Sequence, residues 1–208
     1  MADITAWSAW SEIVAPTTLT RGTTTNRVTL DLSGKLAGRL NIRIAMIDTT
    51  VPATGIDIFV KPLCGADGAV DIQGIGTYFV TRYLPVGTIA KTAIAGDVAD
   101  GQTTLKVDAA TNFAVGDTLA IFDAAYTRLE FNQVMNANTT PTPNEIYLAS
   151  PLCYAHTDVD SDVVIDNAGG WNIMLQDGCV YEIITSYADD ATGSNAVLQV
   201  MAQTEDYV

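Results

Sequence analysis

A chain of 208 residues with 48% hydrophobic residues can form one β domain or two smaller ones around a substantial core. Only 16% of the residues are charged, and 24 acidic side chains outnumber 10 basic ones to give a net charge of −14. Such acidity argues against a nucleic-acid or anionic-membrane partner, since both attract clustered lysine and arginine. The low charge content favours a protein that is packed against neighbours.

The charge is unevenly distributed along the chain. Residues 1–90 contain seven basic and seven acidic side chains, whereas residues 91–208 contain three basic and 17 acidic ones. No run approaches the roughly 18 apolar residues that span a bilayer, and the first residues lack the basic start and apolar segment of a secretory signal. We therefore expect a neutral part that docks on a neighbour and an acidic surface that faces water.

Residues 1–20 are expected to form an N-terminal arm. Trp7, Trp10, Ile13 and Val14 are separated by intervals that fit one face of a short helix, or an arm lying in a groove. Two large aromatic side chains so close to a terminus need burial, either on the chain's own domain or on a neighbouring subunit.

Beyond the arm, apolar and polar residues alternate with a period of two, which predicts half-buried strands. The clearest example runs from Leu40 to Met46. Glycines, prolines and Asp-Gly pairs mark the turns, with Gly34 and Gly38 in the first of them, and the Asp-Gly pair at 177–178 fits a tight hairpin. Strands are predicted around residues 27–32, 40–46, 56–63, 77–86, 103–107, 118–122, 128–135, 171–176, 179–187 and 194–203, with further short strands in 145–165 and loops at 64–76 and 136–144.

These elements predict an all-β protein, a discontinuous antiparallel β-sandwich of jelly-roll-like form built from residues 21–90 and 166–208. A small β-barrel-like domain, residues 91–165, is inserted between the two parts. A single larger sandwich is the alternative. Cys64, Cys153 and Cys179 match no metal-binding spacing and are expected to be reduced core residues, with a disulfide as the less favoured alternative.

The sole histidine, His156, precedes three alternating aspartates, Asp158, Asp160 and Asp162. If this stretch is a strand, the three carboxylates lie on one face and can chelate a hard cation such as calcium. Carboxylates on a solvated strand are far commoner than metal sites, and the pattern lacks the glycine and glutamate of an EF-hand loop. The prediction is therefore no metal and no cofactor, with these aspartates as the residues that any cation site would use.

No catalytic motif emerges from the sequence. A Ser-His-Asp hydrolase needs His156 as its base, and no Gly-x-Ser-x-Gly turn accompanies it. The Gly-x-Gly at residues 74–76 lacks the third glycine and the helix of a dinucleotide site. Aromatic residues such as Trp7, Trp10 and Trp171 can line a sugar-binding face, although β cores use aromatic side chains mainly as filling. We predict a protein without enzymatic activity.

The order of segments resembles that of virion structural proteins of tailed bacteriophages. The similarity comprises the opening RGTTTNRVTLDLSGKLAGRLNIRIAM at residues 21–46, the insert GQTTLKVDAATNFAVGDTLAIFD at 101–123 with IYLASPLCYAHTDVDSDVV at 146–164, and a returning strand pair. The insert pattern is its most specific part and covers about a third of the chain. The resemblance implies an auxiliary capsid protein that decorates or cements the shell, and it carries over no catalytic residues.

The implied partners are the major capsid protein and copies of the chain itself, without nucleic acid or membrane, in a virion assembled in the host cytoplasm. From the neutral part of the chain, Trp7, Trp10, Ile13, Arg21 and Arg27 are the predicted contacts to the shell or to other subunits. One alternative is a tail, neck or fibre component that binds carbohydrate or a host surface. Another, a metal-dependent hydrolase, needs His156 and the aspartates to converge in a pocket.

Overall fold

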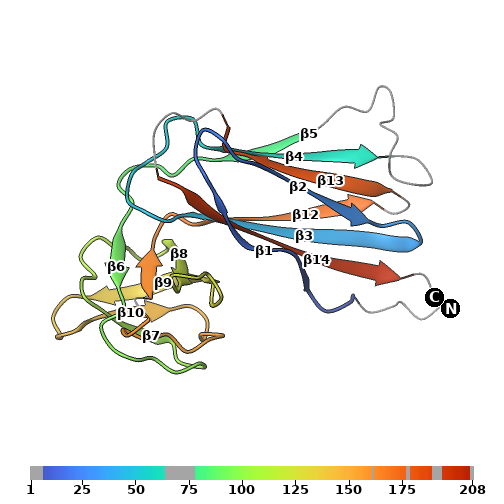
Figure 1. Cartoon of the computed structure of the whole chain (residues 1–208). Helices are drawn as coiled ribbons and strands as arrows, with labels where there is room; N and C mark the ends of the chain where they lie inside the picture. Colours follow the sequence, from blue (N-terminus) through green and yellow to red (C-terminus); the bar gives the residue numbers. More distant parts are fainter. Residues whose placement is uncertain (1–6, 64–77, 161, 177–178, 189–193, 207–208) are drawn as a thin grey trace.

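The structure is a computed structural model that describes residues 7–63, 78–160, 162–176, 179–188 and 194–206. In these ranges the regular secondary structure consists of β-strands, which pair in an antiparallel manner in three sheets (Figure 1). No helix of the described residues is long and apolar enough to cross a membrane. The predicted all-β antiparallel sandwich is confirmed.

Two four-stranded sheets form the sandwich (Figure 1). Each sheet combines strands from the first and the last part of the sequence. In sheet order, the first sheet contains β1 (Ser11–Leu19), β14 (Ala196–Asp206), β3 (Lys35–Met46) and β12 (Gly169–Gln176), and the second contains β2 (Thr25–Asp31), β13 (Val180–Ser186), β4 (Ile56–Leu63) and β5 (Tyr78–Tyr83).

The strand order of the sandwich is that of a jelly roll. Taken in chain order without β6 to β11, the first strand pairs with the last, as β1 with β14. The same nesting continues inward with β2 and β13, then β3 and β12, then β4 and β5. The pairs β14–β3 and β13–β4 join these hairpin layers into two sheets. A long antiparallel hairpin rolled up in this way is the eight-stranded jelly roll.

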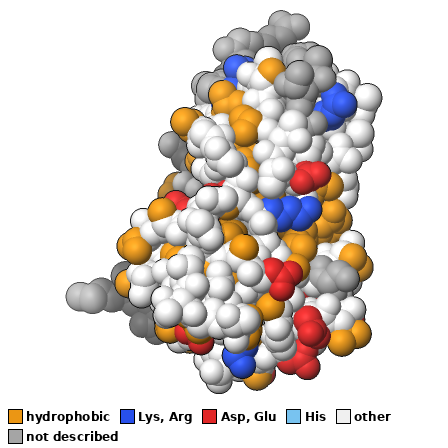
Figure 2. Space-filling view, turned by 90° about the vertical axis from the view of Figure 1, so that its left-hand side faces the viewer, with side chains coloured by type: hydrophobic (Ala, Val, Ile, Leu, Met, Phe, Trp, Pro, Cys, Tyr) orange, Lys and Arg blue, Asp and Glu red, His pale blue; other side chains and the backbone are white. Residues whose placement is uncertain are grey.

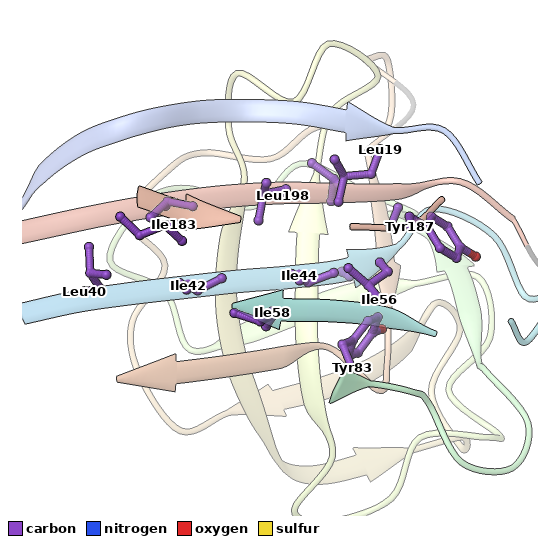
Figure 3. Close-up of a cluster of buried hydrophobic side chains, with 14 of the residues drawn as sticks. Leu19, Leu40, Ile42, Ile44, Ile56, Ile58, Tyr83, Ile183, Tyr187 and Leu198 are labelled. Atoms are coloured by element: carbon purple, nitrogen blue, oxygen red, sulfur yellow. The ribbon is translucent and has the colours of Figure 1, made fainter. Parts of the chain in front are cut away.

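Apolar residues that alternate along the strands fill the space between the two sheets. Leu40, Ile42 and Ile44 of β3 are fully buried, and β4 contributes Ile56 and Ile58 from the opposite sheet (Figure 3). Full burial of one such side chain contributes about 1.5–3 kcal/mol. The alternation that is visible in the sequence therefore determines which face of each strand turns inward.

The strands between β5 and β12 form a third sheet of six strands with a hydrophobic core of its own. The sheet is curled, because its edge strands meet again through a bridge between Ile94 and Val107 and a hydrogen bond from the Ala95 N–H to the Lys106 carbonyl (2.9 Å). In sheet order, its strands are β6 (Lys91–Ala93), β11 (Val163–Ile165), β8 (Thr118–Phe122), β9 (Glu130–Asn138), β10 (Asn144–Leu148) and β7 (Thr104–Val107).

The curled sheet packs against the outer face of the first sandwich sheet. Phe122 and Leu129 belong to the same buried cluster as the sandwich core. Val197 of β14 and its partner Ala45 of β3 are fully buried, although they alternate with side chains that face inward. At the end next to the six-stranded unit, both faces of the first sheet are thus covered. The six-stranded unit therefore packs against the sandwich (Figure 1).

Hydrogen bonds hold together the two segments that connect the sandwich with the curled sheet. The Asp166 carboxylate accepts from the Ala90 N–H (2.7 Å), and the Asp166 N–H donates to the Ala90 carbonyl (3.0 Å). The Tyr83 hydroxyl donates to the Asn167 carbonyl (2.8 Å). Burial raises the pKa of the Asp166 carboxyl and of the Tyr83 hydroxyl. We refer to this paired crossing, residues 84–90 and 166–168, as the neck.

Of the two forms predicted for the N-terminal stretch, a short helix or an arm lying in a groove, the helix is wrong. The stretch makes no helix in the described residues, because Ser11–Leu19 is the edge strand β1 and takes its hydrogen-bond partners from β14. Irregular pairing flanks Pro16, a residue type that sheets accept mainly at their edges.

Other local predictions also need correction. Strands β9 and β10 extend into the predicted loop 136–144, and Gly38 lies within β3 rather than in a turn. Cys153 is exposed, so its expected place in the core is wrong, and Cys179 is half-buried. Cys64, the loop 64–76 and the turn 177–178 lie outside the described residues.

We propose that residues 91–165 form an inserted domain, because β6 to β11 pair only with one another among the named strands of the described residues. Residues 21–90 and 166–208 then form the sandwich, and β1, from the predicted arm 1–20, is counted with it.

Alanine substitutions at the adjacent residues Gly169 and Gly170 test the packing beside the neck. A Cβ at Gly169 would lie 2.4 Å from the Trp171 ring and 2.8 Å from the Tyr83 ring, whereas a Cβ at Gly170 meets nothing within 4 Å. Gly169→Ala should therefore lower the free energy of unfolding by about 1–3 kcal/mol, and Gly170→Ala should change it by less than about 0.5 kcal/mol. Urea denaturation measures both, and equal effects would contradict the packing described.

Candidate functional site

His156 is the centre of a buried charge network in the six-stranded unit. Its side chain is fully buried, with Nδ1 2.8 Å from an Asp162 oxygen and Nε2 2.7 Å from a Glu130 oxygen. Ionised carboxylate oxygens can only accept hydrogen bonds, so each of these two contacts needs a proton between its partners. The imidazole ring is therefore held from both sides.

The loop that carries His156 is fixed by further hydrogen bonds. The His156 backbone forms a two-way bridge with Val98, at 2.8 and 2.9 Å. The Cys153 N–H donates to Glu130 (2.8 Å), and the Thr157 N–H donates to Asp162 (3.1 Å). Both carboxylates thus have donors besides the ring, as buried charges require.

Arg128 extends the network towards the surface. Its Nη2 lies 2.8 Å from Asp160 and 3.3 Å from Asp162, and its Nε lies 3.6 Å from Asp123. The hydrogen bond from Arg128, with a second from Thr157, lowers the pKa of Asp160, and the same ion pair raises the pKa of Arg128. Burial alone would raise the pKa of Asp123, but hydrogen bonds from Thr127 and Arg128 outweigh it and leave that pKa lowered.

This geometry is structural rather than catalytic. A general base must reach a substrate proton, yet His156 exposes no surface and both of its ring nitrogens are engaged. The hydrolase alternative therefore has no support from the histidine on which it depended.

The three aspartates do not share one strand face. Only Val163–Ile165 forms a strand, and Asp158 lies exposed in the turn before it. Asp160 and Asp162 are both paired with Arg128. Among the described residues, no group of three His, Cys, Asp or Glu side chains is arranged to hold a metal ion.

The predicted contact residues lie in two regions. Trp7 stacks under the Arg39 guanidinium at 3.9 Å, Trp10 is 40% exposed, and Ile13 packs half-buried on the sandwich core. All three precede or belong to β1.

The two arginines of the predicted contact set lie elsewhere. Arg21 follows β1 and donates its N–H to the Asn195 side chain (3.3 Å). Arg27 lies on β2 of the second sheet, where it pairs with Glu182 at 3.2 Å.

Sequence reasoning missed a groove of about 440 Å³ between the outer face of the first sheet and the six-stranded unit. We call it the Arg43 groove. The row of polar residues on β3 that alternates with the aliphatic core residues indicates a polar outer face of the sheet, but it does not locate a groove. Side chains from both parts of the molecule line it, among them Trp10, Asn41, Arg43, Tyr154, Asn172 and Gln199.

Two polar groups in the Arg43 groove lack ordinary partners. The Arg43 Nε donates to the Asn41 side chain (2.5 Å). No carboxylate of the described residues lies within 4 Å of the Arg43 guanidinium. Burial lowers the pKa of Arg43. Gln199 is 8% exposed; its Nε2 donates to Glu12 (2.6 Å), whereas its buried Oε1 has no hydrogen-bond partner in the described residues.

The end of the molecule that carries the six-stranded unit has a mixed surface. Figure 2 shows hydrophobic, acidic and basic side chains interspersed among other side chains and backbone. Exposed apolar residues such as Val115, Met135 and Val159 contribute to this surface. Scattered apolar side chains of this kind are normal for a protein surface.

No protein-family model and no curated protein sequence matches the chain. Among solved structures, VP2 of infectious bursal disease virus, in its subviral particle, has 10% sequence identity and a TM-score of 0.25, with 98% of this chain and 82% of that chain covered. VP17, a capsid protein of bacteriophage P23-77, has 9% identity and a TM-score of 0.21, with 98% of both chains covered. Similarity at this level does not establish a shared fold.

Removing the His156 ring should destabilise the protein. His156→Ala leaves two buried carboxylates without their shared partner, which costs about 3–5 kcal/mol in comparable cases. Asp158→Asn, an exposed control two residues away, should change the free energy of unfolding by less than about 0.5 kcal/mol. Chemical denaturation at neutral pH compares them, and a nearly neutral His156→Ala would refute the network.

The ion pair of Asp160 should give stability that depends on pH. A lowered pKa means that the folded protein favours the ionised form of Asp160. The stabilisation is therefore present at pH values above the pKa of an aspartate in the unfolded chain, about 3.9, and is lost as the pH falls through the pKa in the folded protein. Asp160→Asn should therefore lower the melting temperature at pH 7, and the difference should shrink as the pH is lowered below about 3.9. Thermal melts at pH 7 and along an acid series test this, and a difference that grows on acidification would be the contrary result.

Proposed function

We propose that this chain is a non-enzymatic structural protein of a virus particle. The observation that carries the proposal is the nested strand order of the sandwich, since the jelly roll is an architecture of viral capsid proteins, and also of lectins and cupins. Because a fold does not by itself imply a function, features of the surface and of the polar residues must distinguish these classes.

The arrangement of polar residues favours a structural role over jelly-roll metal enzymes. Catalytic metal sites of proteins need several His or carboxylate ligands around an open position. The chain has one histidine, and the structure engages it fully with Asp162 and Glu130. Asp160 and Asp162, which follow His156 in the chain, are paired with Arg128.

The finer proposal is a capsid decoration or cement protein that binds the outside of a shell and stabilises it. Its partners are then the major capsid protein and copies of itself, in a virion assembled in the host cytoplasm. Low charge content and four sheet-edge strands, β1, β12, β2 and β5, suit a module whose edges neighbours cover. Trp10, exposed beside the edge strand β1, is an anchor of the kind that interfaces favour.

The alternative is a tail, neck or fibre component that binds carbohydrate or a host surface. The Arg43 groove, with the exposed Trp10 and Tyr154 at its wall, is the observation that favours it.

Copy number in purified particles separates these roles. Quantitative mass spectrometry of gradient-purified particles should give this chain in a ratio to the major shell protein near one or a simple fraction of it. A ratio of a few per cent would move the protein to the neck, tail or fibre. Absence from particles would refute the virion proposal.

Substitutions at the predicted contacts test shell binding directly. Deleting residues 1–16 would remove most of β1, so point changes are better suited. Arg21→Glu combined with Arg27→Glu should weaken co-sedimentation with shells that lack this protein by about tenfold or more. Lys106→Glu, an equal charge change per site at an exposed position of β7, is the control. Equal binding by the double variant would exclude these arginines from the contact.

A further inference from the structure

We propose that the Arg43 groove is a binding site for an acidic sugar, a pyranose ring that carries a carboxylate. This goes beyond a structural role in a particle and does not depend on it. The site combines a half-buried guanidinium without a carboxylate partner, an unsatisfied amide oxygen and two exposed aromatic rings.

The guanidinium of Arg43 provides the charge selectivity. Its Nε is held by Asn41, which in turn donates to Asn172 (2.7 Å), so the group is oriented by a hydrogen-bonded chain along the sheet. Its two Nη atoms have no hydrogen-bond acceptor in the described residues, and such a fork matches a carboxylate with two parallel hydrogen bonds. Glu130 also borders the groove, but its carboxylate is taken by His156 and by the Cys153 N–H.

The buried amide oxygen of Gln199 lacks a hydrogen-bond donor among the described residues. An unsatisfied buried acceptor costs about 1–3 kcal/mol, and a carboxylate alone cannot relieve it. A sugar hydroxyl can, because hydroxyl groups both donate and accept, but the Gln199 amide must first rotate so that its buried oxygen meets the groove. The amides of Asn41 and Asn172 border the same groove and supply further polar partners for a ring rich in hydroxyls.

Two aromatic side chains supply the apolar contact that a sugar ring needs. Trp10 and Tyr154 are 40% and 43% exposed and reach the groove from the two parts of the molecule. The C–H face of a pyranose packs on such rings, while its hydroxyls remain available to the amides. The volume of about 440 Å³ lies within the usual range of small-ligand sites.

The neighbouring hollow predicts the orientation of a longer glycan. It measures about 320 Å³ and shares Tyr154 and Gln199 with the Arg43 groove, and its lining includes Glu12, whose carboxylate accepts from the Gln199 amide. A carboxylate would be repelled there, so the acidic ring occupies the Arg43 end and a neutral ring the Glu12 end.

The test is a titration of the full chain with methyl glycosides of glucuronic acid and N-acetylneuraminic acid, followed by two-dimensional amide NMR. At least one should bind with a dissociation constant of about 1 mM or below, with shifts centred on the groove. Methyl glucoside, which lacks the carboxylate, should bind at least about tenfold more weakly.

Three variants complete the experiment. Arg43→Gln should weaken binding of the acidic sugar by about tenfold or more, and Trp10→Ala should weaken both acidic and neutral sugars, which keeps the test valid if the first variant is unstable. Arg27→Gln, on the other sheet, should bind like the wild type.

Several outcomes would overturn the proposal. These are no binding of either acidic sugar, equal binding of the glucoside, or unchanged binding by both groove variants. Stronger binding of a short peptide with a free C-terminal carboxylate than of either sugar would assign the groove to a protein partner instead. None of these results bears on copy number in particles, so the structural proposal is tested separately.

Discussion

The burial of β14 on both faces is the constraint on which the rest of the structure depends. Leu198 faces the other sheet and Val197 faces the six-stranded unit, and both are fully buried. A strand buried on both sides reads as a nearly continuous apolar run, as Ala196 to Val200 does with the single exception of Gln199. The outer face of the first sheet therefore needs a cover, which Phe122 and Leu129 provide.

Several other features follow from this cover. The neck must hold its two crossing segments in register, which the hydrogen bonds between Asp166 and Ala90 accomplish. Towards the chain termini the cover ends and the outer face turns polar, with Arg43, Asn41 and Arg39 on alternate positions of β3. The Arg43 groove lies at this transition, where a polar sheet face meets the wall of the six-stranded unit.

The charge network around His156 and Arg128 reflects the uneven distribution of charge along the chain. Most acidic residues of the chain lie after residue 90, and three of the chain's basic residues accompany them. Arg128 and His156 are therefore placed where each can meet two or more carboxylates. Such a network gives less stability than its number of contacts suggests, because burying its charges costs solvation, but it strongly disfavours any arrangement that leaves one of them alone.

The period-two pattern allowed most of the sandwich to be predicted, since residues such as Leu40 and Ile42 alternate cleanly with polar neighbours. It failed at β1, because the spacing of Trp7 and Trp10 just before this strand also fits a helix. The segment forms a strand because it pairs with β14, which is far away in sequence. The pattern also failed at residues 154–162, where side-chain contacts of His156 and Asp162 replace the strand. The groove could not be predicted because its lining residues come from distant segments and no motif links them.

The nesting of the strands also constrains how the protein is made. β1 leaves the ribosome before its partner β14, and residues 20–195 must be synthesised between them. Until then, the apolar side of β1 and the open edge of β3 have no native neighbour, which is a state prone to mispairing. The β4–β5 hairpin, at the centre of the nest, joins strands that are much closer in sequence, and it is the natural first step of assembly.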